Sequence, residues 1–274
     1  MTVRELLDQV FIHVMPSDDI RQLSQWGAAL DVSCQGVTHD SRSVRPGWVF
    51  VGLRGQKADG AEFAPQAIAA GAAAVVSERA AAPGSPVPWI VVEDARLTLA
   101  WLAAEFFQHP SRQMRVVGIT GTNGKTTTSY IVSAIFEAAG VRCGLMGTVK
   151  YRIGDREIAA ARTTPEAPEL QAMLREMVDA GSGACAMEVS SHALSLRRAD
   201  GIHFAAGVFT NLTRDHLDFH ADMEGYFAAK RRLFELLPSD APAVVNLDDP
   251  RGSAMAEAAT RTVTYAVNRA ADVT

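Results

Sequence analysis

A glycine-rich turn between an apolar run and a helical pattern limits the folds open to this chain more than any other feature. The run MRVVGIT (residues 114–120) has the length and β-branched content of a buried strand, TGTNGKTT (120–127) continues from it, and residues 125–139 have helical spacing. Glycines let consecutive N–H groups of such a turn point at phosphate oxygens, and the helix N-terminus adds a favourable dipole. The turn therefore predicts an α/β fold with a phosphate loop between strand and helix.

This phosphate loop predicts a site for a nucleoside triphosphate. Lys125 is expected to reach the outer phosphates, and the hydroxyl of Thr126 is expected to ligate Mg²⁺. The full pattern G-x-x-x-x-G-K-[ST] is not met, because Ile119 stands at its first glycine. A glycine-rich turn that binds nothing is the alternative, and the intact G-K-T between strand and helix disfavours it. The expected nucleotide-binding residues are Gly121, Thr122, Asn123, Gly124, Lys125, Thr126 and Thr127.

Strand and helix patterns alternate through the second part of the chain, which predicts a mostly parallel sheet with helices on both faces. Strands are expected at 114–120, 143–149, 184–190, 204–212, 242–248 and 261–267, and helices at 125–139, 166–180 and 224–237. In such sheets ligands bind at the carboxyl ends of the strands. The last strand pattern is followed only by AADVT, so we expect this domain to be incomplete at its C-terminus.

Shorter patterns in the first part predict a small α/β domain. Strands are expected at 48–53, 72–78 and 89–94, and helices at 63–71 and 95–108. The sequence His-Pro-Ser at 109–111 breaks the last of these helices. We therefore expect a first domain over residues 1–108 and a second over residues 109–274.

Charge and composition argue against several classes of protein. A net charge of −5 and an isoelectric point near 5.8 disfavour a general nucleic-acid or membrane-surface binder. No apolar run approaches the ~20 residues that span a bilayer, and the first ten residues lack the apolar core of a signal peptide. The three cysteines are far apart, so no disulfide framework or zinc spacing is visible. A cytoplasmic protein, monomeric by default, is expected.

Two polar segments follow predicted strands and are candidates for a site. Glu188 ends a buried strand and needs a partner for its charge, which Mg²⁺ on a bound triphosphate would supply. The segment FTNLTRDHLDFH (209–220) offers Asn211, Asp215 and His216. For His216 alone a structural role is the alternative, whereas two such segments beside a phosphate loop favour a site. Asp218 and His220, in the same segment, are expected on the solvated surface.

The helical segment EGYFAAKRRLFELLP (224–238) carries a lysine where an apolar side chain is expected. Tyr226, Leu233 and Phe234 share one face at helical spacing, and Lys230 lies in the middle of that face. On position alone, such a lysine is expected to bury its stem and keep its ammonium group in water.

Five segments together resemble the Mur ligases. They are TGTNGKTT, TTPEAPEL (163–170), EVSSHAL (188–194), FTNLTRDHLDFH and YFAAKRRLF (226–234). The segment THDSRSVRPGWVFVGLRGQKADGAEF (38–63) is similar to the family's UDP-binding domain. The match is closest to the MurE type, which adds the third peptide residue to UDP-N-acetylmuramoyl-L-alanyl-D-glutamate. The phosphate loop alone is shared with folylpolyglutamate synthetases, whereas EVSSHAL together with TTP is far more specific.

The resemblance implies a set of site residues, an activity and cofactors. The substrate carboxylate would attack the γ-phosphate of ATP to give an acyl phosphate, which the amine of an incoming amino acid, by family frequency meso-diaminopimelate, then displaces. Lys125, Lys230 and His216 are implied as catalytic. Mg²⁺ would be held by Thr126, Glu188, His216 and Lys230, the last as a carbamate formed with CO₂. The residues implied to bind UDP-N-acetylmuramoyl-L-alanyl-D-glutamate are Ser41, Gly55, Gln56, Lys57, Thr163, Thr164, Ser190 and Arg198.

Arg162 and Leu196 depart from residues that some family members carry at these positions. The family also has a third domain, which binds the amino acid, and we expect it to lie beyond Thr274. The chain alone is therefore expected to bind nucleotides without completing the ligation. Three alternatives remain open: a folylpolyglutamate- or cyanophycin-type ligase, a non-catalytic nucleotide-binding module, and a structural remnant whose nucleotide binding ignores Mg²⁺.

Overall fold

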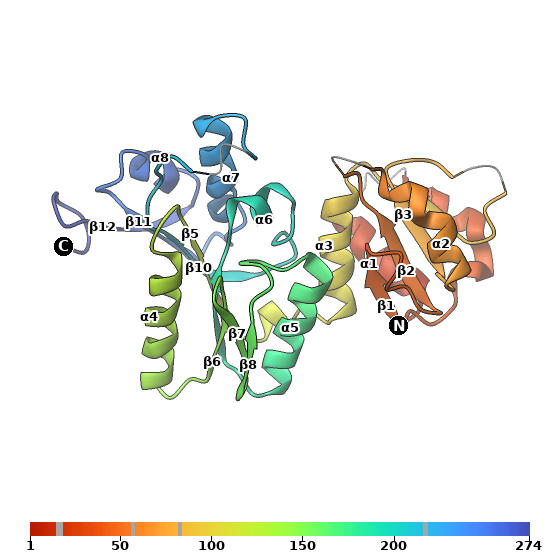
Figure 1. The fold of residues 1–274 in the computed structure, drawn as a ribbon, viewed down its shortest axis with the longest axis horizontal. Helices are drawn as coiled ribbons and strands as arrows, with labels where there is room; N and C mark the ends of the chain where they lie inside the picture. The colour runs from red at the N-terminus through yellow and green to blue at the C-terminus, as the bar shows by residue number, and fades with distance from the viewer. Residues whose placement is uncertain (15–18, 56–57, 82–83, 216–218) are drawn as a thin grey trace. The chain divides into compact units, whose positions relative to one another are not determined.

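A computed structural model describes residues 1–14, 19–55, 58–81, 84–215 and 219–274. The chain divides into two compact units, Met1–Gln108 and His109–Thr274, and Figure 1 shows a sheet with helices in each of them. Within the described residues, no helix is both long enough and apolar enough to cross a membrane.

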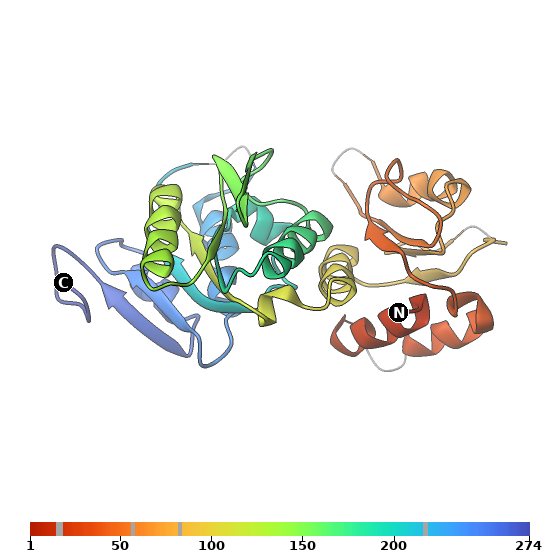
Figure 2. The same ribbon diagram turned by 90° about the horizontal axis from the view of Figure 1, so that it is seen from below.

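The first unit is built on a fully parallel sheet whose strands lie in chain order, β1 (Gly36–Thr38), β2 (Trp48–Gly52), β3 (Ala74–Ser77) and β4 (Trp89–Val91). Ala64 and Ala67 of α2 (Ala64–Ala69) pack with Phe50 and Val75 on one face. Figure 2 shows α1 (Val3–Val14) on the other side of this sheet. The remaining helices are α3 (Ala95–Phe106) and the 3₁₀ segments Asp19–Leu30 and Gly60–Phe63.

The sheet of the second unit has eight strands in the order β12-β11-β10-β5-β9-β6-β7-β8. All pairings from β12 to β6 are parallel, and β7 and β8 form an antiparallel hairpin at one edge. The α/β class with a mostly parallel sheet is confirmed. The strands are β5 (Arg115–Thr120), β6 (Cys143–Met146), β7 (Lys150–Ile153), β8 (Arg156–Ala159), β9 (Ala184–Glu188), β10 (Phe204–Phe209), β11 (Pro242–Asn246) and β12 (Arg261–Tyr265).

Helices cover both faces of this sheet, as the alternating pattern predicts. On one face, Val132 and Phe136 of α4 (Lys125–Ala138) pack on a cluster that includes Ile119 and Leu145. On the other face, a larger core brings together side chains of the remaining helices, and Leu174, Leu194 and Phe234 belong to it. These helices are α5 (Ala167–Asp179), α6 (Ser191–Ser195), α7 (Met223–Glu235) and α8 (Gly252–Ala256), and a 3₁₀ turn, Pro110–Arg112, precedes β5.

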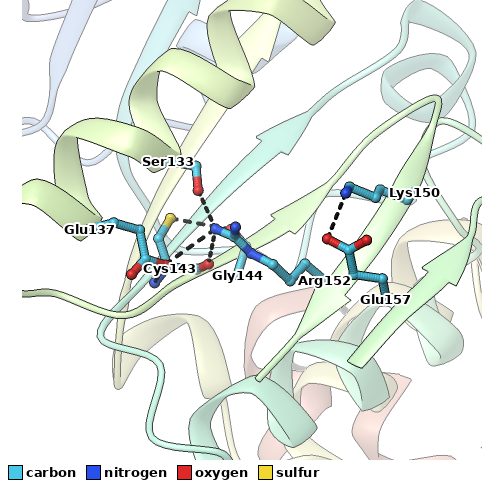
Figure 3. A network of polar contacts seen from close by, with 7 residues as sticks. All are labelled: Ser133, Glu137, Cys143, Gly144, Lys150, Arg152 and Glu157. Carbon is cyan, nitrogen blue, oxygen red and sulfur yellow. Dashed lines mark hydrogen bonds and ion pairs between the residues drawn. The ribbon is translucent and has the colours of Figure 1, made fainter. Parts of the chain in front are cut away.

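The hairpin of β7 and β8 is absent from the sequence prediction, and a network of polar contacts joins it to α4. The guanidinium of Arg152 on β7 donates to the hydroxyl of Ser133, to the carbonyl of Cys143 at 2.8 Å and to the carboxylate of Glu137 at 3.3 Å (Figure 3). Glu137 also accepts from the N–H of Cys143 at 3.0 Å. The network therefore joins the far end of the phosphate-loop helix to two strands.

The strand order places the phosphate loop at a switch point of the sheet. The loop follows β5, which lies between β9 and β10. Chain segments that follow β9 and β10 therefore flank it on either side. Crevices at the carboxyl ends of strands around such a point are the usual ligand sites of open α/β sheets.

Candidate functional site

Asn211, just after β10, fixes the curvature of the phosphate loop. Its side-chain amide makes a reciprocal pair with the backbone of Asn123, accepting from the N–H at 3.0 Å and donating to the carbonyl at 3.1 Å. Its own carbonyl accepts from the N–H of Thr122 at 2.8 Å. Two N–H groups at the start of the loop are thus bonded within the protein, which leaves those from Gly124 onwards at the N-terminus of α4.

Gly121 is required where the loop passes β10. Its φ of +146° lies where side chains are rarely tolerated, and a Cβ added there would lie 1.9 Å from the hydroxyl oxygen of Thr210. That hydroxyl donates to the carbonyl of Asn123 at 2.7 Å. The close approach that the glycine permits therefore lets Thr210, the residue after β10, bond directly to the loop.

Two lysines converge inside this loop. The ammonium of Lys125 donates to the carbonyls of Gly121 at 2.9 Å and Thr122 at 2.8 Å. The ammonium of Lys230, from α7, also donates to the carbonyl of Gly121, at 2.8 Å, and lies 4.4 Å from the ring centroid of Tyr226. Lys230 is only 1% exposed, so the expectation that its head snorkels into water is wrong.

Burial weakens the proton affinity of both amines. Desolvation, and then repulsion by Lys125, lower the pKa of Lys230 from 10.5 to about 7, although the Asp215 carboxylate opposes this. Desolvation also lowers the pKa of Lys125, against the attraction of Glu188 and Asp215. An amine with a pKa near neutrality is a nucleophile at physiological pH, which an ordinary surface lysine is not.

Glu188 ends β9 as a fully buried carboxylate, and its partners are hydroxyl and N–H groups. The Thr126 hydroxyl donates to it at 3.1 Å, and Thr148 donates to it through its hydroxyl and its N–H, each at 3.0 Å. Thr126 is on the first turn of α4, so the carboxylate lies where phosphate-bound Mg²⁺ would be expected.

The oxygen donors of Thr126 and Glu188 suit Mg²⁺. This ion is usually bound through one or two carboxylates together with substrate phosphates and water, and needs no cage of side chains. Within the described residues, no three His, Cys, Asp or Glu side chains gather closely enough to form one. The neighbouring hydroxyl and carboxylate therefore fit the ion as partial ligands.

The loop before α5 meets the N-terminus of α6 beside Glu188. The hydroxyl of Thr164 donates to the carbonyl of Glu188 at 3.0 Å and accepts from the N–H of Ser190 at 3.2 Å. Arg198 donates to the carbonyl of Thr164 at 3.2 Å and forms an ion pair with Glu166 at 2.6 Å. Thr164 is 1% exposed, so its hydroxyl holds the loop, while Thr163 is only partly buried.

Arg162 also forms an ion pair with Glu166, which places two guanidinium groups on one carboxylate. The residue that departs from the family pattern thus has a local partner in this loop.

In the first unit, a separate hollow of about 420 Å³ lies beside Ser41. The Ser41 hydroxyl donates to the side-chain carbonyl of Gln66 at 2.9 Å. Hydrogen bonding by the Arg42 guanidinium lowers the pKa of Asp40 to about 2. Gly55 is not among the lining residues; its N–H donates to the carbonyl of Ala58 at 2.9 Å. The lining residues are His39, Asp40, Ser41, Arg42, Phe63 and Gln66.

Comparison with known proteins identifies the family. The family model described as "Mur ligase middle domain" matches residues 119–274, and "Mur ligase family, catalytic domain" matches residues 33–107. The chain belongs to the Mur ligase family. The resemblance stated from the sequence motifs is therefore confirmed.

Curated relatives of this Mur ligase chain have specific names. The UDP-N-acetylmuramoyl-L-alanyl-D-glutamate--2,6-diaminopimelate ligase of Geobacter metallireducens is 47% identical over 252 residues, which cover 89% of this chain and 49% of the relative. The UDP-N-acetylmuramyl-tripeptide synthetase of a Roseiflexus species is 49% identical over 256 residues, covering 87% and 50%. The chain spans about half the length of the curated relatives it matches.

A solved structure agrees with these matches. It is described as UDP-N-acetylmuramoyl-L-alanyl-D-glutamate--2,6-diaminopimelate ligase and aligns with a TM-score of 0.78 at 30% identity. The alignment covers 98% of this chain and 53% of the other.

The Mur ligase structure brings most of the expected second-unit residues into one neighbourhood, although four expected positions lie outside the described residues. Contacts connect the phosphate loop with Lys230 and Glu188, and Glu188 with Thr163, Thr164, Ser190 and Arg198. Gly124 and Thr127 are exposed at the N-terminus of α4. Outside the described part of the chain lie Gln56, Lys57, His216 and Asp218.

The expectation that His220 is on the solvated surface is wrong. It is 6% exposed, and its ring centroid lies 4.9 Å from that of Phe219 and 5.0 Å from that of Tyr226. A polar residue in a polar segment gave no sign that aromatic neighbours would cover it.

Sequence reasoning also missed the partners that Thr148 and Asn211 make in this Mur ligase. Thr148 lies inside the predicted strand 143–149 as an ordinary polar residue. In the structure β6 ends at Met146, and only the register of β6 beside β9 brings Thr148 to Glu188. The sequence predicts Asn211 as a polar group of the site, but its pairing with the backbone of Asn123 depends on β10 lying beside β5.

Proposed function

We propose that this chain is the UDP-sugar- and ATP-binding part of a MurE-type ligase. The reaction adds the third residue to UDP-N-acetylmuramoyl-L-alanyl-D-glutamate through an acyl phosphate. The name of the Geobacter metallireducens relative, a 2,6-diaminopimelate ligase, supports diaminopimelate as that residue. The observation that carries the proposal is the Thr126 hydroxyl 3.1 Å from the Glu188 carboxylate at the start of α4, beside the Thr163–Thr164 loop.

The phosphate loop would bind and orient the triphosphate. The N–H groups in the first turn of α4 would face its oxygens, and Lys125 would exchange its bonds to two loop carbonyls for bonds to the outer phosphates. The Lys125 ammonium would therefore leave the carbonyls of Gly121 and Thr122 only when the phosphates take their place as acceptors. Bound Mg²⁺ would screen the repulsion between the triphosphate and the attacking carboxylate.

Substrate orientation is assigned to three groups of residues. Ser41, Gly55, Gln56 and Lys57 would hold the uridine diphosphate. Thr163, with Thr164, Ser190 and Arg198 behind it, would position the end of the dipeptide near the phosphate loop. Thr126, Glu188 and His216 would hold Mg²⁺.

Lys230 is proposed to carry a carbamate. Its neutral amine would attack CO₂, forming an N–C bond and releasing one proton to solvent. Burial and a pKa of about 7 support this, because a substantial fraction of the amine is uncharged at neutral pH. The product is an anion near Lys125, so the modification replaces a repulsive pair of cations with an attractive pair. As an anionic oxygen donor, it would become a ligand for Mg²⁺.

The proposal includes a cytoplasmic, monomeric protein that binds neither nucleic acid nor membranes, in keeping with a net charge of −5. Its test is calorimetric titration of the chain with UDP-N-acetylmuramoyl-L-alanyl-D-glutamate and, separately, with a non-hydrolysable ATP analogue and Mg²⁺. We expect saturable binding of both, weakened at least ten-fold by Ser41→Ala for the first ligand and by Lys125→Ala for the second. Arg156→Ala, in an exposed ion pair on β8, is the matched control. Absence of any affinity for uridine nucleotides would contradict the assignment of the first unit.

A further inference from the structure

One residue outside the phosphate loop holds both oxygens of the Glu188 carboxylate. The backbone N–H of Thr148 donates to Oε1 at 3.0 Å, and its hydroxyl donates to Oε2 at 3.0 Å. Glu188 is 1% exposed, so a carboxylate at this position requires such partners. The two bonds fix both the position and the rotation of the carboxylate about its last torsion angle.

The residue before Thr148 makes this arrangement possible. A Cβ added to Gly147 would lie 2.1 Å from Oε1 of Glu188, and no such contact is tolerated by real side chains. Gly147 and Thr148 follow β6, whose Met146 is paired in register with Met187 on β9. The register therefore places a glycine and then a threonine directly beside the carboxylate.

The number of hydrogens available decides which hydroxyl donates and which accepts in this network. A carboxylate only accepts, so the single hydroxyl hydrogens of Thr126 and Thr148 are both used on Oε2 of Glu188. The hydroxyl of Thr163, 3.2 Å from that of Thr148, must then be the donor of that pair. The lone pairs of Thr126 consequently remain available on the side away from the carboxylate.

We propose that Thr148 is a positioning residue that acts through Glu188. It holds the carboxylate at the angle at which Glu188 and Thr126 can bind one Mg²⁺ together. Through Thr163 it also connects this metal-binding pair to the loop that contacts the peptide end of the substrate. This inference rests on the proposed function, since it concerns the metal site of the same nucleotide.

The test is the Mg²⁺ dependence of nucleotide binding, measured by titrating the chain with a non-hydrolysable ATP analogue at a series of Mg²⁺ concentrations. Thr148→Val removes the hydroxyl and retains the N–H and the branched shape, and Thr148→Ser retains the hydroxyl. We expect Thr148→Val to raise the Mg²⁺ concentration at half-saturation about ten-fold, since a hydrogen bond to a charged group is lost. Thr148→Ser is expected to stay within about two-fold of the unmodified chain.

Thr148 is exposed apart from these bonds, so we expect its variants to fold, which a thermal melt checks. Thr148→Ala removes the same hydroxyl from a smaller side chain, and it should give the same shift should the valine prove too bulky. A purely structural role would lower the melting temperature and leave the Mg²⁺ dependence unchanged.

Two failures are distinguishable. Mg²⁺-dependent binding by the unmodified chain, with the same half-saturation in Thr148→Val and Thr148→Ala, overturns the role of Thr148 alone. Binding by the unmodified chain that ignores Mg²⁺ overturns the metal site in the proposed function, and the positioning role with it.

Discussion

Lys125 and Lys230 donate to the same carbonyl oxygen, that of Gly121, at 2.9 and 2.8 Å. Two cations on one acceptor repel each other, and burial prevents water from screening them. Desolvation by burial, and then this repulsion by Lys125, lower the pKa of Lys230 to about 7. An anion would therefore relieve the repulsion between the two ammonium groups. That anion would be either the phosphates bound to Lys125 or a carbamate on Lys230.

The first prediction concerns the pH dependence of stability. Between pH 7 and 10.5 the unfolded chain binds a proton at Lys230 that the folded chain has lost, so the free energy of unfolding should rise with pH in this window. Below pH 7 Lys230 is charged in both the folded and the unfolded chain, and the full free-energy cost of burying its charge remains. Relative to Lys230→Met, the unmodified chain should gain about 2 kcal/mol from pH 7 to pH 9.

Urea denaturation of both proteins, in buffers freed of CO₂, measures this difference. Lys150→Met, which removes a partly buried lysine from an ion pair with Glu157, is the control and should track the unmodified chain. Parallel stability curves for the unmodified chain and Lys230→Met would show that the lysine titrates normally.

The second prediction concerns the carbamate. ¹³C NMR of the chain in ¹³C-bicarbonate should give a carbamate signal that is absent from Lys230→Ala. Lys125→Ala should weaken the signal at pH 7, because loss of the neighbouring cation raises the pKa of Lys230 and removes an attraction for the product. A signal of equal strength in Lys230→Ala would assign the carbamate to another amine.

The third prediction concerns the polar network at the far end of α4. Arg152 is partly buried and bonds to Ser133, Glu137 and the carbonyl of Cys143, so Arg152→Ala should lower the free energy of unfolding by about 2 kcal/mol. The neighbouring ion pair between Lys150 and Glu157 involves a half-exposed carboxylate, and Glu157→Ala should cost less than about 1 kcal/mol. Chemical denaturation measures both, and equal losses would mean that the network of Figure 3 adds nothing beyond a surface ion pair.

The parallel strands could be predicted from the sequence because strands buried on both faces are nearly continuous apolar runs. The strand Cys143–Met146 and the strand Ala184–Glu188 are of this kind, and every residue in both is buried. In the hairpin, by contrast, β8 (Arg156–Ala159) is exposed throughout, and charged residues interrupt both β7 and β8. An edge hairpin held by polar contacts leaves no such apolar signal.

The site was predictable only as far as single motifs. The phosphate loop, the buried Glu188 and the lysine on the apolar face of α7 each carry a local signal in residue type and spacing. Their partners depend on the registers of neighbouring strands, since the pairs Ile119–Glu188, Met146–Met187 and Phe209–Thr120 bring distant segments together. Hydrophobic periodicity does not fix those registers, so the roles of Thr148 and Asn211 could not be derived.

The fourth prediction concerns Asn211 and the phosphate loop. Asn211→Ala removes both hydrogen bonds of the reciprocal pair with Asn123. The loop would then lose conformational entropy when a triphosphate binds, which weakens binding. Affinity for a non-hydrolysable ATP analogue should fall about ten-fold, with little change in melting temperature because the residue is only partly buried. Asn211→Asp is matched in shape and adds a negative charge. It keeps the acceptor for the Asn123 N–H and loses the donor, so at high salt its affinity should lie between those of the unmodified chain and Asn211→Ala. Calorimetric titration at low and high salt separates the repulsion between this charge and the phosphates, which salt screens, from the lost hydrogen bond, which it does not. Unchanged affinity in Asn211→Ala would mean that Thr210 and Gly121 hold the loop without it.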